Sequence, residues 1–209
     1  GLVGKDANGD WVTADCRASG IDGTQLHRTG MAATSYTDAM TVASSGRRTF
    51  FHQRGANALL APDHFDFTET RAKVFVLGFL MLLDTLDTLD DDGVSGAAKV
   101  LRAAREAGMI TAVDCVSEPS PQFREVVLSA LGETDLLFLN EFEIGQAVGR
   151  KVPAERASME EAALELAAKA AREDTRIIVH AVNGAVVAKR DGSLARHSSV
   201  TLPPAEIAG

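Results

Sequence analysis

From residue 73 onward, short apolar runs alternate with stretches of helical periodicity. Gly108 and Gly132 end two of the helical stretches, and Ser158 with Glu161 predicts a capping box at the start of a third, alanine-rich helix. Alternation of this kind predicts an α/β fold, a mostly parallel sheet flanked by helices. The expected strands cover residues 73–79, 109–113, 135–139, 176–181, 185–189 and 194–200, and the expected helices cover 94–107, 122–131 and about 158–172.

The segment 31–54 breaks this alternation. Two β-prone stretches, 33–42 and 47–53, are joined by the sequence Ser44-Ser45-Gly46, which is a hairpin signal. A hairpin that interrupts an α/β chain either packs apart from the main sheet or forms an edge of it. The sequence alone leaves both arrangements open.

Asn140 and Glu143 follow the apolar run 135–139 and precede the helical stretch 144–148. This order puts an amide and a carboxylate at the carboxyl end of a buried strand, where ligands collect in open α/β sheets. The same Asn-x-x-Glu spacing also fits a purely structural role, an N-cap followed three residues later by a carboxylate. Both interpretations stay open at this point.

The formal charge of −8, from 29 acidic and 21 basic side chains, argues against nucleic acid or an anionic membrane as partner. The longest apolar stretch, 74–83, is too short to cross a bilayer, and no targeting signal precedes it. Cys16 and Cys115 form no CxxC pair and are expected to be reduced thiols. We therefore expect a cytoplasmic protein that acts on a small molecule.

The sequence contains neither a complete calcium-binding loop nor a Walker A motif. The acidic stretch 84–92 resembles a calcium loop, but counting Gly93 as its sixth position places Lys99 where the bidentate glutamate belongs. No Walker A sequence occurs, so any use of ATP must do without a P-loop. The histidines other than His180 lack the spacing of metal ligands; they are His27, His52, His64 and His197.

Four stretches are informative as a set because of their order along the chain. They are 1–9 (GLVGKDANG), 16–22 (CRASGID), 46–57 (GRRTFFHQRGAN) and 140–143 (NEFE). Together they resemble the ribokinase-like (PfkB) carbohydrate kinase family, and the resemblance extends from Gly1 to about Thr201. It implies a ribokinase-like α/β core formed by residues 1–30 and 55–209. It also implies that residues 31–54 form a small β lid, which folds over the sugar and often helps to form a dimer.

The resemblance implies ATP-dependent phosphorylation of a hydroxyl of a sugar or sugar-like substrate, with Mg²⁺ as cofactor. Asn140 and Glu143 match the motif that organises Mg²⁺, through water, and the nucleotide phosphates. His180 and Gly184 lie in the segment that meets the nucleotide. His180 stands where threonine or serine is usual and one glycine is missing, and a structural role for this histidine remains an alternative.

On the sugar side, Asn57 matches the place where the chain returns from the lid to the core, although a tight turn explains the same residues. Asp38 and Phe50 on the lid are the other expected substrate contacts. The apolar residues of the lid leave one face in need of cover, which favours a homodimer. These apolar residues are Met40, Val42, Phe50 and Phe51.

The resemblance also places two family segments outside residues 1–209. One is the glycine-rich sugar-binding segment with its aspartate, and the other is the Gly-Ala-Gly-Asp anion hole with the catalytic aspartate. No aspartate of this sequence is assigned as the general base, and Asp191 with Gly192 is explained by a hairpin turn. We expect about a hundred further residues in the complete polypeptide and no turnover by these residues alone.

Two other functions remain possible from the sequence. A non-catalytic ribokinase-fold protein that binds a sugar or nucleotide, or a pseudokinase, would account for His180 and for the missing catalytic segment. An unrelated doubly wound α/β domain that binds a nucleotide would make the hairpin a coincidence.

Overall fold

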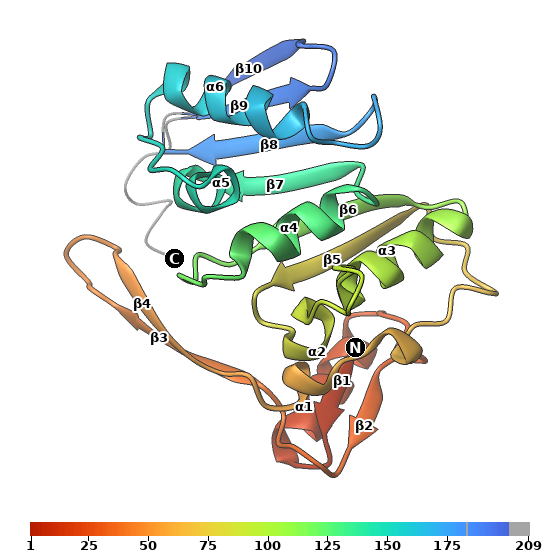
Figure 1. The fold of residues 1–209 in the computed structure, drawn as a ribbon. Helices are drawn as coiled ribbons and strands as arrows, with labels where there is room; N and C mark the ends of the chain where they lie inside the picture. The colour runs from red at the N-terminus through yellow and green to blue at the C-terminus, as the bar shows by residue number, and fades with distance from the viewer. Residues whose placement is uncertain (183, 201–209) are drawn as a thin grey trace. The chain divides into compact units, whose positions relative to one another are not determined.

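The computed structural model describes residues 1–182 and 184–200, and the chain divides into two compact units (Figure 1). Unit 1 contains Gly1–His64 and Leu83–Thr85, and unit 2 contains Phe65–Leu82 and Leu86–Val200. The short helix α2 (Asp84–Asp87) spans the division. The part of the expected core that follows Val200 lies outside the described residues, so the proposed boundaries of core and lid stay predictions.

Unit 2 is built on a six-stranded sheet in the order β10-β9-β8-β7-β6-β5 (Figure 1). Strands β5 to β8 run parallel, whereas β9 and β10 are added antiparallel. The strands are β5 (Val74–Leu80), β6 (Ile110–Cys115), β7 (Leu136–Asn140), β8 (Arg176–Ala181), β9 (Gly184–Lys189) and β10 (Leu194–Ser198). The predicted α/β fold with a mostly parallel sheet is confirmed.

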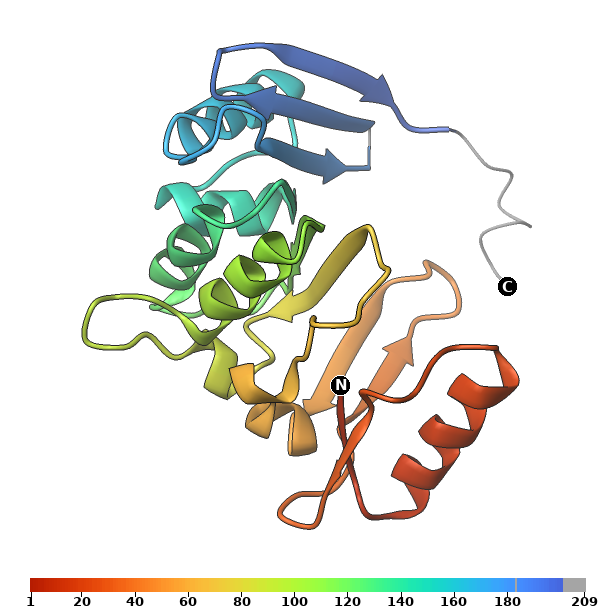
Figure 2. The ribbon, with the colours of Figure 1, turned by 90° about the vertical axis from the view of Figure 1, so that its right-hand side faces the viewer.

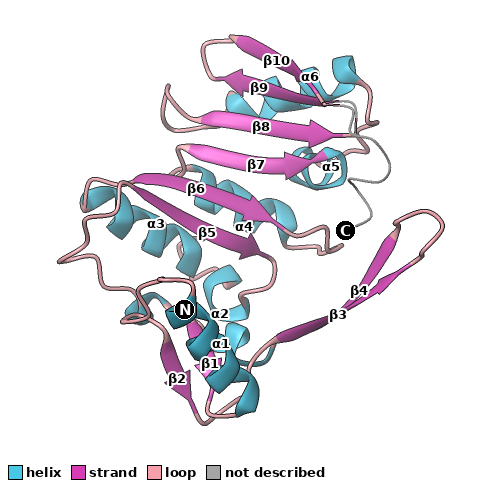
Figure 3. Cartoon of the chain, turned by 180° about the vertical axis from the view of Figure 1, so that it is seen from behind, coloured by secondary structure: helices cyan, strands magenta, loops and turns pink. Residues whose placement is uncertain are grey.

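Four helices cover one face of this sheet, and the view from behind shows the strands in front of them (Figures 1 and 3). They are α3 (Gly96–Glu106), α4 (Phe123–Leu131), α5 (Glu141–Val148) and α6 (Arg156–Ala167). The predicted capping box of Ser158 and Glu161 is wrong, because α6 already begins at Arg156, after Glu155, which makes no side-chain cap. Its buried residues are Met159, Ala162, Ala163, Leu166 and Ala167, which form one apolar face.

The core of unit 2 lies between these helices and the sheet. Val113, Leu137 and Ile177 pair in register on neighbouring strands and are at most 1% exposed. Residues that pair in register share a face, so this row belongs to the face that the helices cover. Burial of such branched side chains contributes about 1.5–3 kcal/mol each to the stability of the fold.

The other face of the sheet is also apolar. Phe138 and Ile178 pair in register there, one residue out of step with the buried row, and both are only half-buried. Val76 on β5 shares this face, because it pairs with Ala112, and it is 66% exposed. Among the described residues of unit 2, no helix covers this second face (Figure 3).

Unit 1 begins with a parallel pair of short strands, β1 (Leu2–Gly4) and β2 (His27–Thr29), joined through α1 (Ala7–Ala18), which lies next to β1 (Figure 2). The Asp6 carboxylate caps α1 by accepting from the Gly9 N–H at 2.8 Å, and it also accepts the N–H and the hydroxyl of Thr34, both at 2.7 Å. These hydrogen bonds with Thr34, and then that from Gly9, lower the pKa of Asp6. Asp6 therefore joins the first helix to the segment before the hairpin.

The predicted hairpin forms in unit 1 as β3 (Tyr36–Thr41) and β4 (Arg48–Gln53). These two strands make their own two-stranded antiparallel sheet, and among the described strands they pair only with each other. Figure 1 shows them as a ribbon that extends away from β1 and β2. Two short 3₁₀ helices follow, Gly55–Leu59 and Pro62–His64.

Helix α5 lies unusually close to the chain that follows it. A β-carbon added at Gly145 would meet the carbonyl oxygen of Arg150 at 2.8 Å and the nitrogen of Val152 at 3.4 Å. Backbone atoms cannot yield as a flexible side chain can. Glycine at this position therefore allows the segment after α5 to fold back against the helix.

We expect Gly145→Ala to lower the free energy of unfolding by about 1–3 kcal/mol, the usual cost of overpacking, despite the gain in helix propensity. Urea denaturation measures this change. Gly132→Ala is the matched control, because Gly132 has φ −59° and its added β-carbon would meet only the Ser129 carbonyl oxygen, at 3.9 Å. A Gly145→Ala protein as stable as the control would contradict the packing argument.

Candidate functional site

The carboxyl ends of the parallel strands of unit 2 bring polar side chains to one edge of the sheet. Asn140, at the end of β7, pairs in register with His180 on β8. Asp114 lies near the end of β6 and pairs with Phe138, one pleat before Asn140. The edge therefore carries an amide, an imidazole and a carboxylate from three neighbouring strands.

Asn140 and Glu143 form a complete capping box at the first turn of α5. The Oδ1 atom of Asn140 accepts hydrogen bonds from the N–H groups of Phe142 and Glu143, each at 2.9 Å. In return, the Oε2 atom of Glu143 accepts the N–H of Asn140 at 2.8 Å. The structural interpretation of the Asn-x-x-Glu spacing is thus confirmed, and it does not exclude a ligand at the same helix terminus.

Ser117, in the loop after β6, joins the two residues of the box. Its hydroxyl donates to Glu143 Oε1 at 2.8 Å and accepts from Asn140 Nδ2 at 2.6 Å. Sequence reasoning did not identify Ser117, because a lone serine in a loop has no diagnostic spacing. Only the register that places the end of β6 beside β7 brings it to the capping box.

Glu143 is only 3% exposed, and burial raises the pKa of its carboxyl above the ordinary value of 4.5. The hydrogen bonds from Asn140 and Ser117 act in the opposite direction and lower this pKa. The negative charge of Asp114 raises it further, and the charge of His180 lowers it. Desolvation thus favours the neutral carboxyl group of Glu143, whereas its hydrogen-bond donors favour the charged carboxylate.

This arrangement does not suit direct ligation of a metal ion by Glu143, since both of its oxygens already accept a hydrogen bond and the group is buried. Asn140 uses its own oxygen for the two cap bonds. In residues 1–182 and 184–200, no three His, Cys, Asp or Glu side chains gather as a set of metal ligands. The donor set fits Mg²⁺ only through intervening water, which is the role that the resemblance implies.

Cys115, the last residue of β6, is buried beside this cluster. Burial raises the pKa of its thiol well above the ordinary value, and the charges of Glu143, Asp114 and Asp87 add to the rise. A neutral thiol is a poor nucleophile. Cys115 is therefore a packing residue, and both cysteines are free thiols, as expected.

His180 and Gly184 are the two expected nucleotide contacts, and local packing explains only Gly184. The imidazole of His180 is exposed and makes no hydrogen bond with the part of the chain that the structure describes. Gly184 has φ +136°, and an added β-carbon would meet the His197 carbonyl oxygen at 2.1 Å. Glycine at 184 is thus explained by the close approach of β10, whereas His180 is left available to a ligand.

Asn57, in unit 1, lies in the 3₁₀ helix that follows the hairpin. Its backbone N–H donates to the Arg54 carbonyl at 3.0 Å, and its carbonyl accepts from Leu60 at 3.2 Å, so the expected tight turn is present. Its half-buried side-chain amide makes no hydrogen bond with the described residues. The Asn57 amide thus differs from that of Asn140, whose oxygen accepts both cap bonds.

Asp38 and Phe50 point to opposite faces of the hairpin. Asp38 pairs in register with Phe51, whereas Phe50 pairs with Ala39, and paired residues of antiparallel strands share a face. The guanidinium of Arg48 lies over the Phe50 ring, 5.8 Å from its centre. The two expected substrate contacts therefore cannot both face a ligand that lies against one side of the ribbon.

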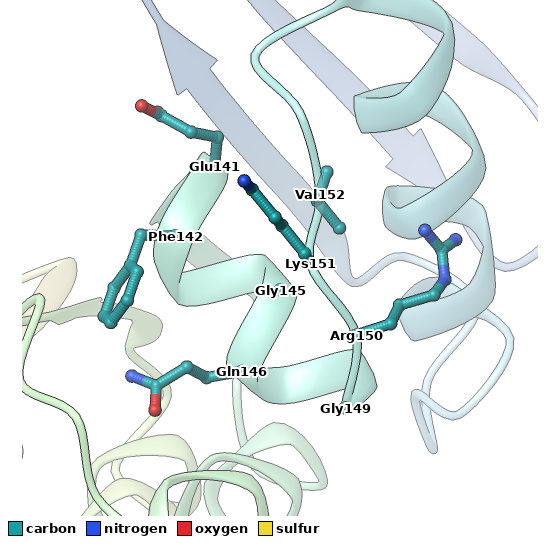
Figure 4. Close-up of a pocket in the computed structure, with 8 residues that line it drawn as sticks. All are labelled: Glu141, Phe142, Gly145, Gln146, Gly149, Arg150, Lys151 and Val152. Carbon is teal, nitrogen blue, oxygen red and sulfur yellow. The ribbon is translucent and has the colours of Figure 1, made fainter.

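A pocket of about 540 Å³ lies beside α5 and the segment that follows it (Figure 4). Figure 4 shows Phe142 and Gln146 projecting from one side of the helix, while Arg150 points away toward α6. Glu141, in the first turn of α5, is half-buried and lines this pocket. Neither Asn140 nor Glu143 lines the pocket, so it is separate from the candidate site.

A family model for pfkB carbohydrate kinases matches residues 1–204. The chain belongs to the pfkB family of carbohydrate kinases. The capping box at Asn140 and the polar edge of the sheet are therefore features of a pfkB-family chain. No curated protein sequence matches it.

Solved structures show the same fold for this pfkB-family chain. Giardia lamblia ribokinase has a TM-score of 0.72 at 16% identity, with 96% of this chain and 59% of that chain covered. Sinorhizobium meliloti adenosine kinase has a TM-score of 0.72 at 20% identity, with 97% and 58% covered. Xylella fastidiosa fructokinase with bound ATP has a TM-score of 0.70 at 17% identity, with 97% and 61% covered.

The pfkB-family chain thus spans about three fifths of the length of these structures. At such identities the likeness shows the fold, which is the ribokinase fold that the resemblance predicts. Within the two ranges that the structure describes, no helix is both long and apolar enough to cross a membrane.

We expect the stability of the protein to depend on the charge of Glu143. Because the folded-state pKa is raised, ionisation costs more in the folded than in the unfolded protein. The contribution of Glu143 to the free energy of unfolding is therefore fully present below about pH 4.5 and is lost as the pH rises through the folded-state pKa. Glu143→Gln keeps a capping side chain but does not titrate.

Urea denaturation at several pH values measures this effect as the difference between wild type and Glu143→Gln. Wild type should lose stability relative to the variant as the pH rises from about 4.5. Glu141→Gln, in the same first turn, is the matched control. An equal pH-dependent difference for both variants would mean that burial of Glu143 is not the cause.

Proposed function

We propose that the intact protein transfers the γ-phosphate of ATP to a hydroxyl of a sugar or nucleoside. The observation that carries this proposal is the family match over residues 1–204. The solved structures of the same fold support it, because they include a ribokinase, a fructokinase and an adenosine kinase. The use of ATP is supported by a fructokinase with bound ATP and a ribokinase in complex with ADP.

The first turn of α5 supplies the anion-binding part of this proposal. A helix N-terminus at the carboxyl edge of a parallel sheet places a partial positive charge there for phosphate, while its own cap already takes the N–H groups of Phe142 and Glu143. The exposed imidazole of His180 lies one strand away from Asn140. We assign the nucleotide to this edge, with Asn140, Glu143, His180 and Gly184 as the residues that hold or shape its site.

Mg²⁺, when bound with ATP, would neutralise charge on the phosphates. Asn140 and Glu143 would hold it through water, because their direct hydrogen bonds are already made within the capping box. The chain's own contribution is to fix the helix terminus, to keep the Glu143 carboxylate hydrogen-bonded, and to present the imidazole of His180.

On the acceptor side we assign Asn57, because its amide is free, together with one face of the β3–β4 hairpin acting as a lid. The face that carries Asp38 also carries exposed apolar side chains, so it is the face that a second copy of the chain would cover in a homodimer. These side chains are Tyr36, Met40, Val42 and Phe51, whereas Phe50, expected on the same face, lies on the other.

The proposed function is tested by calorimetric titration of the intact protein with ATP in the presence and absence of Mg²⁺. A coupled assay for ADP release then screens sugars and nucleosides as acceptors. Binding of Mg²⁺-ATP with phosphorylation of one acceptor is the expected result. Binding without any turnover would support the pseudokinase alternative, for which His180 in place of threonine or serine is the specific observation.

We expect Glu143→Ala to lower kcat/KM by about 10–100-fold, the usual effect of removing an outer-shell group that orients the ligands of a metal ion. The measurement is steady-state kinetics with ATP as the varied substrate. The same variant should remain folded, because the cap formed by Asn140 is retained. Unchanged activity and unchanged Mg²⁺ dependence would contradict the assignment.

Asp38→Ala and Phe50→Ala should have unequal effects on the KM for the acceptor, because the two side chains lie on opposite faces of the hairpin. We expect Phe50→Ala to raise this KM by about tenfold or more, the effect of losing about 1.4 kcal/mol of binding energy, and Asp38→Ala, on the face assigned to the second copy, to leave it unchanged. The KM for ATP serves as the internal control. Equal increases for both variants would argue against a rigid hairpin with one substrate-facing side.

A further inference from the structure

The loop between β6 and α4 is hydrogen-bonded to α5 at two places. Ser117 is hydrogen-bonded to both residues of the capping box. One turn further along α5, Gln146 donates to the Glu118 carbonyl at 2.9 Å and accepts the Ser120 N–H at 3.4 Å. The loop is therefore held along the first two turns of the helix.

The hydrogen bonds of Ser117 and those of Gln146 have different consequences. Gln146 contacts only backbone atoms of the loop, and its side chain also lines the separate pocket beside α5. Ser117 contacts the two side chains that the proposed function assigns to the nucleotide phosphates. Its hydroxyl is both acceptor and donor in one chain of hydrogen bonds, from Asn140 Nδ2 through Ser117 Oγ to Glu143 Oε1.

This chain of hydrogen bonds fixes the orientation of the Asn140 amide. The Oδ1 atom faces the helix N–H groups, and Nδ2 faces Ser117. An amide nitrogen carries two hydrogens, so one N–H of Asn140 remains after the bond to Ser117. Without the hydroxyl, the Nδ2 group would lose its only protein acceptor among the described residues, and only the two cap bonds to Oδ1 would hold the amide.

We propose that Ser117 is a positioning residue for the nucleotide. Its hydroxyl sets the direction of the remaining Asn140 N–H and holds the Glu143 carboxylate in place at the helix terminus. This inference rests on the proposed function, since it assigns a role at the same site. Asp114 and His180 are the charged or titratable groups of the neighbouring strands that act on Glu143, and neither replaces the hydroxyl bridge.

Ser117→Val and Ser117→Thr form a matched pair for the test, because the two side chains have nearly the same shape and only threonine retains the hydroxyl. We expect Ser117→Val to raise the Kd for Mg²⁺-ATP by about tenfold, and Ser117→Thr to stay within about threefold of wild type. Ser120→Ala, in the same loop but remote from Glu143, should leave the Kd unchanged. Calorimetry on the intact wild-type protein and the three variants gives the four constants.

Urea denaturation of the same proteins separates positioning from folding. Ser117 is exposed, so water can solvate the groups that lose its hydroxyl without fixing their direction, and the midpoint of Ser117→Val should stay close to that of Ser117→Thr. Equal Kd values for the valine and threonine variants, with wild type binding Mg²⁺-ATP normally, would overturn the role of Ser117 and leave the proposed function intact. Failure of wild type to bind Mg²⁺-ATP would overturn both.

Discussion

The candidate site depends on how the first turn of α5 satisfies its backbone donors. A helix that begins directly at the end of a buried strand leaves N–H groups at the sheet edge, and these must find acceptors. Asn140 supplies two of the bonds, and Glu143 returns one to the N–H of Asn140. Because these bonds fix both side chains, the same interaction that starts the helix also determines what a ligand meets there.

This dual use explains why a structural and a functional interpretation of Asn-x-x-Glu are not in competition. The capping box consumes the oxygen of Asn140 and both oxygens of Glu143, once Ser117 is included. Beside the box, the edge carries one amide N–H and the exposed ring of His180 on the next strand, together with the Asp114 carboxylate of β6. The amide N–H and the imidazole suit an anion better than they suit a bare cation.

The sequence could predict the sheet of unit 2 and the hairpin because both depend on local signals. Apolar runs of the right length mark the strands, and Ser44-Ser45-Gly46 marks the turn of the hairpin. The start of α6 could not be predicted from a cap signal, since the helix begins at Arg156 without any side-chain cap and Ser158 lies inside it. The role of Ser117 and the opposed faces of Asp38 and Phe50 depend on strand register, which the sequence does not state.

The register of the hairpin also limits how this chain can diverge. Side chains alternate between faces along a strand, so a shift of one residue in one strand reverses all of its faces. With a turn one residue shorter or longer, Asp38 would share a face with Phe50 in place of Phe51. The length of the connection around Ser44-Ser45-Gly46 thus decides which side chains act together. A single insertion or deletion there would change the chemistry of both faces without replacing any residue on them.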